Sequence, residues 1–402
     1  MANNITSQIQ NLAKQFYPTV QKLYEQLHQI PELGWDLPQT SLIIQGELKK
    51  LGIPFVIINK TGILATLKFA KPGKVLLLRA DMDALPILEE SGVPYASKVP
   101  GNMHACGHDS HMANMLGTTM ILNSLKDVLQ GTIKLMFQPC EEIDAGGAKL
   151  MIENGILENP NVDAAIAMHC GGCIKTGDNL PQEGDFEIRS GSCSGSPDDF
   201  FIRIIGKGGH AAAPHLAIDP IVIAAQFVNA AQTIVSRYVN PLRAGLITFG
   251  TINAGQTTNV IPEYCDLSGT ARSSDPDTRK ILKDKLEEVL KSCCEAFHAT
   301  YTFKYELNYP PMVTDEKITN LVKNAAAKIL GKEHVFEIPE SSLGAEDFSY
   351  VAEKVPSAFY RITLAPDVFG HHPKFKINGD KYFYNDMCVM AQSVFDFLVG
   401  GE

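Results

Sequence analysis

Apolar residues along this chain follow two patterns, and each predicts a different kind of element. Where they recur every three or four positions, as at Ile9, Leu12 and Phe16, the pattern is typical of a helix that buries one face. Short continuous runs such as Val75–Leu78 are typical of strands buried on both faces. In the first half we expect helices at 6–29, 39–51, 108–126 and 145–154, and strands at 55–58, 62–67, 75–78, 132–137 and 164–168. This alternation predicts an α/β fold with a mostly parallel sheet flanked by helices.

The order of elements changes at about residue 193. Strands are expected at 199–205, 244–253, 263–272 and 300–307, with helices at 219–238 and 276–297. This β-α-β-β-α-β order predicts a self-contained antiparallel sheet with two helices. Because the α/β pattern resumes after Pro310, we expect one domain made of residues 1–192 and 310–402, interrupted by an inserted α+β domain at 193–309.

Polar side chains follow several of the predicted strands of the first domain. They are Arg79, Asp81 and Asp83 after 75–78, Glu141 and Glu142 after 132–137, and His169 after 164–168. Open parallel sheets bind ligands at the carboxyl ends of their strands, so these residues are expected to share one edge.

The densest group of reactive side chains is His104-Ala-Cys-Gly-His-Asp-Ser-His111, which precedes and begins a predicted helix. Cys106 and His108 are good ligands for a borderline-soft divalent metal. Similar clusters are Cys140-Glu141-Glu142, Met168-His169-Cys170 and Gly370-His371-His372-Pro373. Taken singly, the first cluster also fits a polar capping turn, and the Glu141-Glu142 pair also fits a solvated acidic turn. Together they predict a metal centre, in which one carboxylate of the Glu pair binds metal and the other acts as general base.

Other polar positions leave two interpretations open. Asp83, with Asp81, could orient ligating imidazoles or make loop hydrogen bonds. His210 lies in a glycine-rich turn that lacks the Lys-Ser/Thr ending of a phosphate loop, and it is either a surface residue or one that reaches an active site. Arg272, beyond Asn259 on the next strand, fits either a substrate carboxylate or a structural ion pair.

Composition narrows the function classes. The 402 residues are 45% hydrophobic with a net charge of -10, which argues against nucleic acid as a partner. No apolar run is long enough for a membrane helix, and the N-terminus lacks a signal-peptide pattern, so we expect a cytoplasmic protein that does not bind membranes. Nine cysteines are an odd number for disulfides, and we interpret Cys170 and Cys173 as incidental thiols.

Several strings, in this order, resemble the zinc aminoacylase/carboxypeptidase metallopeptidase superfamily, and within it the amidohydrolase branch that includes hippurate hydrolase, bacterial N-acyl-amino-acid amidohydrolases and plant auxin-conjugate hydrolases. The strings are Arg79–Pro86, Met103–Asp109, Gln138–Glu142, Met168-His169, Gly208–Ala211, Asn259–Pro262, Gly344–Phe348 and Gly370–Pro373.

The resemblance implies a two-metal site that holds Zn²⁺ or Mn²⁺, with Co²⁺ or Ni²⁺ as further possibilities. The implied ligands are Cys106, His108, Glu142, His169 and His371 rather than His372. Cys106 would bridge the ions and Glu141 would be the catalytic base, with Asp83 grouped among the catalytic residues.

The inserted domain would form a homodimer and act as a lid. His210 would reach the partner's active site, and Asn259 with Arg272 would help to bind substrate. The chain departs from the family at Cys140, at Ile143-Asp144 and after His169, which puts the choice of substrate in doubt.

The predicted function is metal-dependent hydrolysis of the amide bond of a small-molecule N-acyl amino acid. Three alternatives stay open. One is a carboxypeptidase, dipeptidase or N-acetyl-diaminopimelate deacetylase with the same centre. The second is a thiol hydrolase that uses Cys106, and the third is a binding protein with a structural metal.

Overall fold

The computed structural model describes residues 2–142, 146–172, 181–364, 370–377 and 380–400. The chain divides into two compact units. The first unit comprises Met1–Gly191, Thr314–Glu340 and Tyr350–Glu402, and the second comprises Ser192–Val313 and Ser341–Ser349. The short segment Ser341–Ser349 therefore belongs with the second unit, although the sequence pattern had placed it in the domain that resumes after Pro310.

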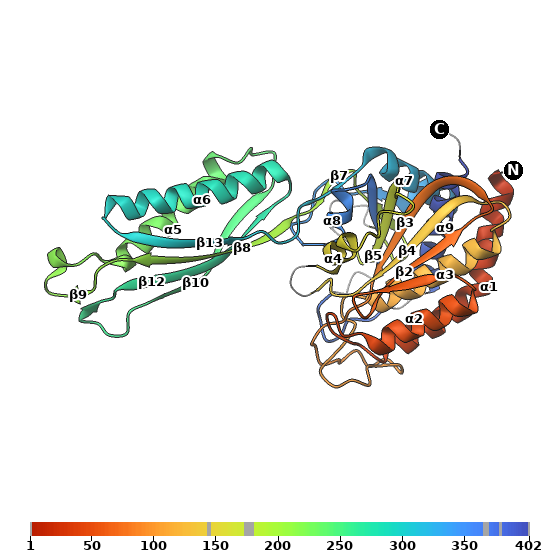
Figure 1. Ribbon diagram of the computed structural model, residues 1–402, viewed down its shortest axis with the longest axis horizontal. Coiled ribbons are helices and arrows are strands. Elements are labelled where there is room, and N and C mark those ends of the chain that lie inside the picture. The colour runs from red at the N-terminus through yellow and green to blue at the C-terminus, as the bar shows by residue number, and fades with distance from the viewer. Residues whose placement is uncertain (1, 143–145, 173–180, 365–369, 378–379, 401–402) are drawn as a thin grey trace. The chain divides into compact units, whose positions relative to one another are not determined.

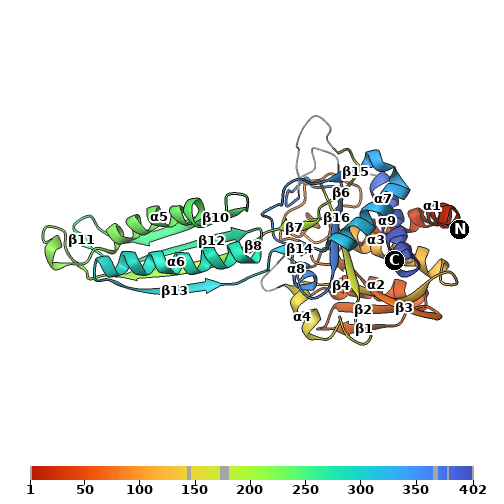
Figure 2. The same ribbon diagram turned by 90° about the horizontal axis from the view of Figure 1, so that it is seen from above.

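The first unit is built on an eight-stranded sheet of order β1-β2-β4-β3-β5-β16-β6-β15 (Figures 1 and 2). Its strands are β1 (Phe55–Ile58), β2 (Gly62–Lys68), β3 (Lys71–Asp81), β4 (Gln130–Gln138), β5 (Ala164–Cys170), β6 (Phe186–Ile188), β15 (Val335–Glu337) and β16 (Ser357–Ile362). The central strands β4, β3, β5 and β16 run parallel to their neighbours in that series, so their carboxyl ends share one edge. The mostly parallel sheet is confirmed, with antiparallel pairings at β1-β2, β2-β4 and β16-β6.

Helices pack against this sheet and against one another. They are α1 (Ala2–His28), α2 (Pro38–Lys50), α3 (His108–Ser124), α4 (Gly147–Glu153), α7 (Glu316–Leu330), α8 (Ser349–Ala352) and α9 (Asp380–Leu398). Figure 2 shows α1, α3 and α9 grouped together, and α3 and α9 both contact β3. Residues His108–Leu122 of α3 are all buried, polar and apolar side chains alike, so this part of the helix turns no face to solvent. The start of α3, which carries the His104–His111 string, is therefore anchored in the core.

The second unit has a four-stranded antiparallel sheet of order β10-β12-β8-β13. Its elements run β8 (Ser196–Ile205), α5 (Pro220–Arg237), β10 (Gly245–Ala254), β12 (Tyr264–Ser273), α6 (Pro276–Ala296) and β13 (Thr300–Glu306). Short strands β9 (Gly209–His210) and β11 (Val260–Ile261) pair with each other, and β7 (Gly191–Ser194) pairs with β14 (Met312–Thr314). The β-α-β-β-α-β order predicted from the sequence is thus present, and α5 and α6 begin where Asp219 and Asp275 cap them.

The two units have separate hydrophobic cores. Among the described helices, none is both long and apolar enough to cross a membrane.

Candidate metal centre

The centre begins at a tight turn before α3. Gly107 has a φ of 85°, and a Cβ there would lie 2.3 Å from Sγ of Cys170. Only glycine fits this combination of positive φ and close contact. The turn places Cys106 just before the N-terminus of α3 and makes His108 the first residue of that helix.

The backbone just beyond the end of β3 orients His108. Its Nδ1 lies 2.8 Å from the carbonyl oxygen of Asp83, an acceptor that requires the proton on Nδ1. Nε2 is then a bare acceptor, and it is buried with no hydrogen-bond partner among the described residues. Buried polar atoms are rarely left in this state, and an imidazole tied through its other nitrogen is typical of metal ligands.

His169 shows the same arrangement on β5. Its Nδ1 donates to the carbonyl oxygen of Cys170 at 2.7 Å, and its Nε2 lies 3.4 Å from Sγ of Cys106. The sequence pattern had placed His169 just after the strand, whereas it is the penultimate residue of β5. The strand therefore fixes the direction of this imidazole.

Glu142 and His371 meet on another side of Cys106. Nε2 of His371 lies 3.2 Å from Oε1 of Glu142. The backbone of His371 has a φ of 58°, and its N–H donates to the carbonyl oxygen of Ala105 at 2.8 Å. This bond ties the loop that carries His371 to the turn that carries Cys106.

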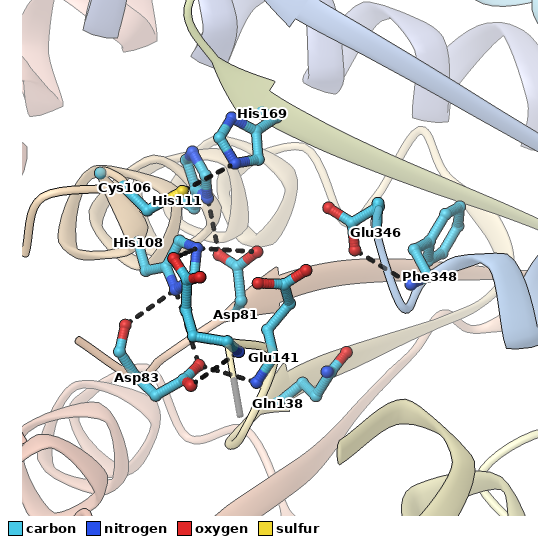
Figure 3. Close-up of polar contacts among 12 residues, drawn as sticks. Asp81, Asp83, Cys106, His108, His111, Gln138, Glu141, His169, Glu346 and Phe348 are labelled. Carbon is cyan, nitrogen blue, oxygen red and sulfur yellow. Dashed lines mark hydrogen bonds and ion pairs between the residues drawn. The ribbon is translucent and has the colours of Figure 1, made fainter. Parts of the chain in front are cut away.

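The predicted ligand atoms thus form two groups that share one thiol. Cys106, His108 and His169 make one group, and Cys106, Glu142 and His371 make the other, with ligand atoms within 4.8 Å of one another in each. Figure 3 shows Cys106, His108 and His169 converging. Thiolate, imidazole and carboxylate are ligands for zinc and related ions, and the unpartnered Nε2 of His108 faces this cluster. The residues therefore fit two ions that share Cys106.

Burial and charge set the protonation of these ligands. Burial raises the pKa of the Cys106 thiol well above its ordinary value, and the Glu142 carboxylate adds to the rise. Burial lowers the pKa of His169 well below its usual range, so this imidazole is neutral. Burial alone would raise the pKa of Glu142, but its hydrogen bond with His371 holds that pKa below the ordinary value.

Asp83 contacts the other site residues through its carboxylate. Its two oxygens accept the backbone N–H groups of Glu141 at 3.0 Å and of Glu142 at 3.1 Å. The side chain of Asp83 is 1% exposed and that of Glu141 8%. Asp83 is therefore a positioning residue, and it fixes the turn that holds Glu141 beside His108 and Glu142, where the three form a further group of nearby ligand atoms (Figure 3).

Behind the ligands lies a second polar chain, whose function the sequence pattern did not reveal. Arg79 donates to Asp81 at 2.6 Å, and the other oxygen of Asp81 lies 2.6 Å from Nδ1 of His111. Nε2 of His111 accepts the backbone N–H of Cys170 at 2.9 Å. Both nitrogens of His111 are used by the protein, so this imidazole braces the end of β5 and is not a ligand.

The predicted residues of the inserted unit fall into two places. His210 is exposed and pairs with Val260 across β9 and β11, next to Asn259, whose carbonyl accepts the N–H of Ala211 at 3.1 Å. Arg272 lies near the far end of β12, where its guanidinium donates to the carbonyl oxygen of Leu343 at 3.1 Å. Within this unit, His210 and Asn259 are neighbours and Arg272 is remote from both. Cys173 lies outside the described residues, as do Ile143 and Asp144.

A sheet whose strand ends gather thiol, imidazole and carboxylate donors beside an additional glutamate defines a metal-dependent hydrolase. The chain belongs to Peptidase family M20/M25/M40, which matches residues 77–394. The resemblance inferred from the sequence motifs is thereby confirmed.

Individual relatives carry different activities. The N-acetyl-L-cysteine deacetylase of Bacillus subtilis (strain 168) is 41% identical over 357 residues, which cover 88% of this chain and 82% of that protein. Thermostable carboxypeptidase 2 of Saccharolobus solfataricus is 36% identical over 386 residues, covering 94% of this chain and 95% of that protein. A solved Bacillus subtilis structure, a dinuclear metal binding peptidase from the M20 family, has a TM-score of 0.82 and 30% identity and covers 96% of this chain and 99% of its own.

Proposed function

We propose that this protein hydrolyses the amide bond of N-acyl amino acids, releasing a carboxylate and a free amino acid. The observation that carries the proposal is the shared-thiol arrangement, in which two ligand groups meet at Cys106 with Glu141 beside them. The similarity to an N-acetyl-L-cysteine deacetylase supports an N-acyl amino acid as substrate.

Two divalent ions, Zn²⁺ or Mn²⁺ with Co²⁺ or Ni²⁺ as alternatives, would be held by Cys106, His108, Glu142, His169 and His371. When bound, such ions supply a water of lowered pKa and a Lewis acid for the amide oxygen. Glu141 takes the proton from the attacking water at its carboxylate and returns it to the departing amine nitrogen. Asp83 keeps Glu141 in place by accepting its backbone N–H.

The inserted unit supplies an argument for a homodimer. His210 and Asn259 lie beyond the Tyr264 end of β12, whereas Arg272 lies near its other end. The eight residue-to-residue steps from Tyr264 to Arg272 span about 26 Å of strand, which exceeds the length of a small N-acyl amino acid. Arg272 and the His210–Asn259 pair therefore cannot contact one such substrate within one protomer. We infer that His210 and Asn259 of one subunit serve the active site of its partner, where His210 would help to stabilise the oxyanion.

A carboxypeptidase or dipeptidase with the same centre is the second candidate, favoured by the similarity to a thermostable carboxypeptidase. A thiol hydrolase using Cys106 is opposed by the position of its Sγ, which belongs to both groups of candidate metal-ligand atoms. A purely structural metal is opposed by the number of ligands, because structural zinc sites are closed and four-coordinate.

The test is amine release from N-acetyl, N-benzoyl and N-indoleacetyl amino acids, N-acetyl-diaminopimelate and free dipeptides. Each reaction is run with Mn²⁺ or Zn²⁺ and again with chelator. We expect metal-dependent release from N-acyl amino acids. Release from free dipeptides alone would favour the second candidate, and silence across the panel with metal bound would refute both.

A further inference from the structure

One charged residue beside the metal centre has no part in the chemistry described so far. Arg361 is the penultimate residue of β16, and in the parallel register it lies directly opposite His169, the penultimate residue of β5. Register partners on neighbouring strands point to the same face of a sheet. Arg361 and the ligand His169 therefore share one face at the carboxyl edge, where open parallel sheets bind ligands.

The guanidinium of Arg361 is held by an aromatic ring and not by a carboxylate of the described residues. It lies over the ring of Phe359, 5.1 Å from the ring centroid, and Phe359 is itself only 2% exposed. Stacking on a buried ring limits the positions that a planar guanidinium can take. Arg361 is partly buried, and no carboxylate in the described part of the chain lies within ion-pair distance of it.

The acidic side chain nearest in register does not remove this charge. Glu187 on β6 lies opposite Arg361, but its Oε1 accepts the hydroxyl of Thr363 at 2.6 Å. Glu187 is 3% exposed. A partly buried cation without a counter-ion is costly unless a ligand supplies the opposite charge.

We propose that Arg361 is a specificity-determining residue that binds a second carboxylate of the substrate, on either the acyl group or the amino-acid side chain. This inference rests on the proposed function and concerns a carboxylate other than the α-carboxylate that every N-acyl amino acid carries. A substrate with a neutral acyl group and a neutral side chain leaves Arg361 unpaired. A guanidinium binds a carboxylate through two parallel hydrogen bonds, which an amide of the same shape cannot match.

The test uses two pairs of substrates that differ only in a carboxylate replaced by a carboxamide. N-acetyl-L-glutamate with N-acetyl-L-glutamine places the charge on the side chain, and N-succinyl-L-leucine with N-succinamoyl-L-leucine places it on the acyl group. We expect the wild type to prefer the acidic member of one pair by about 10- to 100-fold in kcat/KM. Arg361→Gln should abolish that preference while leaving the neutral substrates unchanged, and Arg361→Lys should restore part of it.

A matched control and a binding measurement separate this role from a structural one. Arg203 is exposed on the second unit, so Arg203→Gln removes the same charge and should leave the preference intact. Calorimetry in a Glu141→Gln background measures the affinities for the four compounds without turnover. If Arg361 had only a structural role, Arg361→Gln would weaken the binding of acidic and neutral compounds alike.

The inference and the proposed function fail in different ways. Hydrolysis of both members of each pair with equal kcat/KM would overturn the role of Arg361 and leave the proposed function standing. If no N-acyl compound is hydrolysed, the proposed function fails, and calorimetry still decides on Arg361. If an acidic compound binds more tightly than its neutral partner, and Arg361→Gln abolishes this difference, the role of Arg361 is supported. Equal affinities for the two compounds would overturn that role.

Discussion

Replacing Asp83 by Asn tests how firmly the Glu141–Glu142 turn is held. Each carboxylate oxygen of Asp83 accepts one backbone N–H, from Glu141 at 3.0 Å and from Glu142 at 3.1 Å. In Asp83→Asn one oxygen becomes an NH₂ group, which would face an N–H donor. The backbone carbonyl of residue 83 remains, so the orientation of His108 is preserved.

The magnitude follows from the lost contact. A hydrogen bond to a charged group contributes about 1.5–3 kcal/mol. If the whole of this free energy is lost from metal binding by Glu142, the metal-binding constant falls by about 10- to 150-fold. Measured changes in groups that orient metal ligands cover a similar range, about 10- to 100-fold in affinity. We therefore expect Asp83→Asn to weaken metal binding by one to two orders of magnitude.

The assay is competition for Zn²⁺ or Mn²⁺ with a chromophoric chelator, combined with kcat/KM at saturating metal. Asp163→Asn is the control, because Asp163 also accepts a backbone N–H, that of Val75 at 2.7 Å, and is exposed to solvent. A folded Asp83→Asn variant with the metal affinity of the wild type and of Asp163→Asn would refute the reasoning.

Three further predictions concern the base, the dimer and a buried carboxyl group. Glu141→Gln should keep its metal and lose about 10²- to 10⁴-fold in kcat, since only the proton transfer is removed; near-normal turnover would exclude Glu141 as the base. A His210→Ala variant mixed with Glu141→Gln should regain partial activity through hybrid dimers, and no recovery in mixtures shown to exchange subunits would count against a shared site. Burial raises the pKa of Asp386 to about 7, so its contribution to stability is present at low pH and is lost as the pH rises towards 7. Asp386→Asn should gain about 3 kcal/mol in free energy of unfolding relative to wild type between about pH 5 and 8, measured by urea titration, and a difference independent of pH would contradict this explanation.

Much of the fold could be predicted because hydrophobic periodicity decides where elements begin and end. The expected helix at 276–297 and the observed Pro276–Ala296 differ by one residue, because Asp275 and Pro276 are strong start signals. The segment Ser341–Ser349 has no periodicity, so the sequence pattern does not distinguish it from the residues around it. Its association with the second unit comes from contacts such as the bond from Gly195 N–H to the carbonyl of Gly344, which no local pattern reveals.

The candidate ligands could be predicted by residue type, but the sequence could not tell which of two neighbouring histidines keeps a ring nitrogen free for metal. His108 and His111 lie three positions apart on α3, yet one keeps a bare Nε2 and the other uses both nitrogens in hydrogen bonds. Arg361 was missed for another reason. It lies inside the strand sequence Ser357–Ile362, where a single charge is easily taken for an edge residue, and only the strand register places it opposite His169.

The end of β3 and the two residues after it position several segments of the site. Asp81 holds His111, and His111 holds the backbone at Cys170, next to the ligand His169. Asp83, two residues further along, holds the turn that carries Glu141 and Glu142. The two aspartates therefore fix different ligand segments, although only Met82 separates them in the sequence. Because the segments that carry His108, Glu142 and His169 are all tied to this stretch of chain, their donor atoms can stay within reach of one another before any ion binds, which is the condition for tight and selective metal binding.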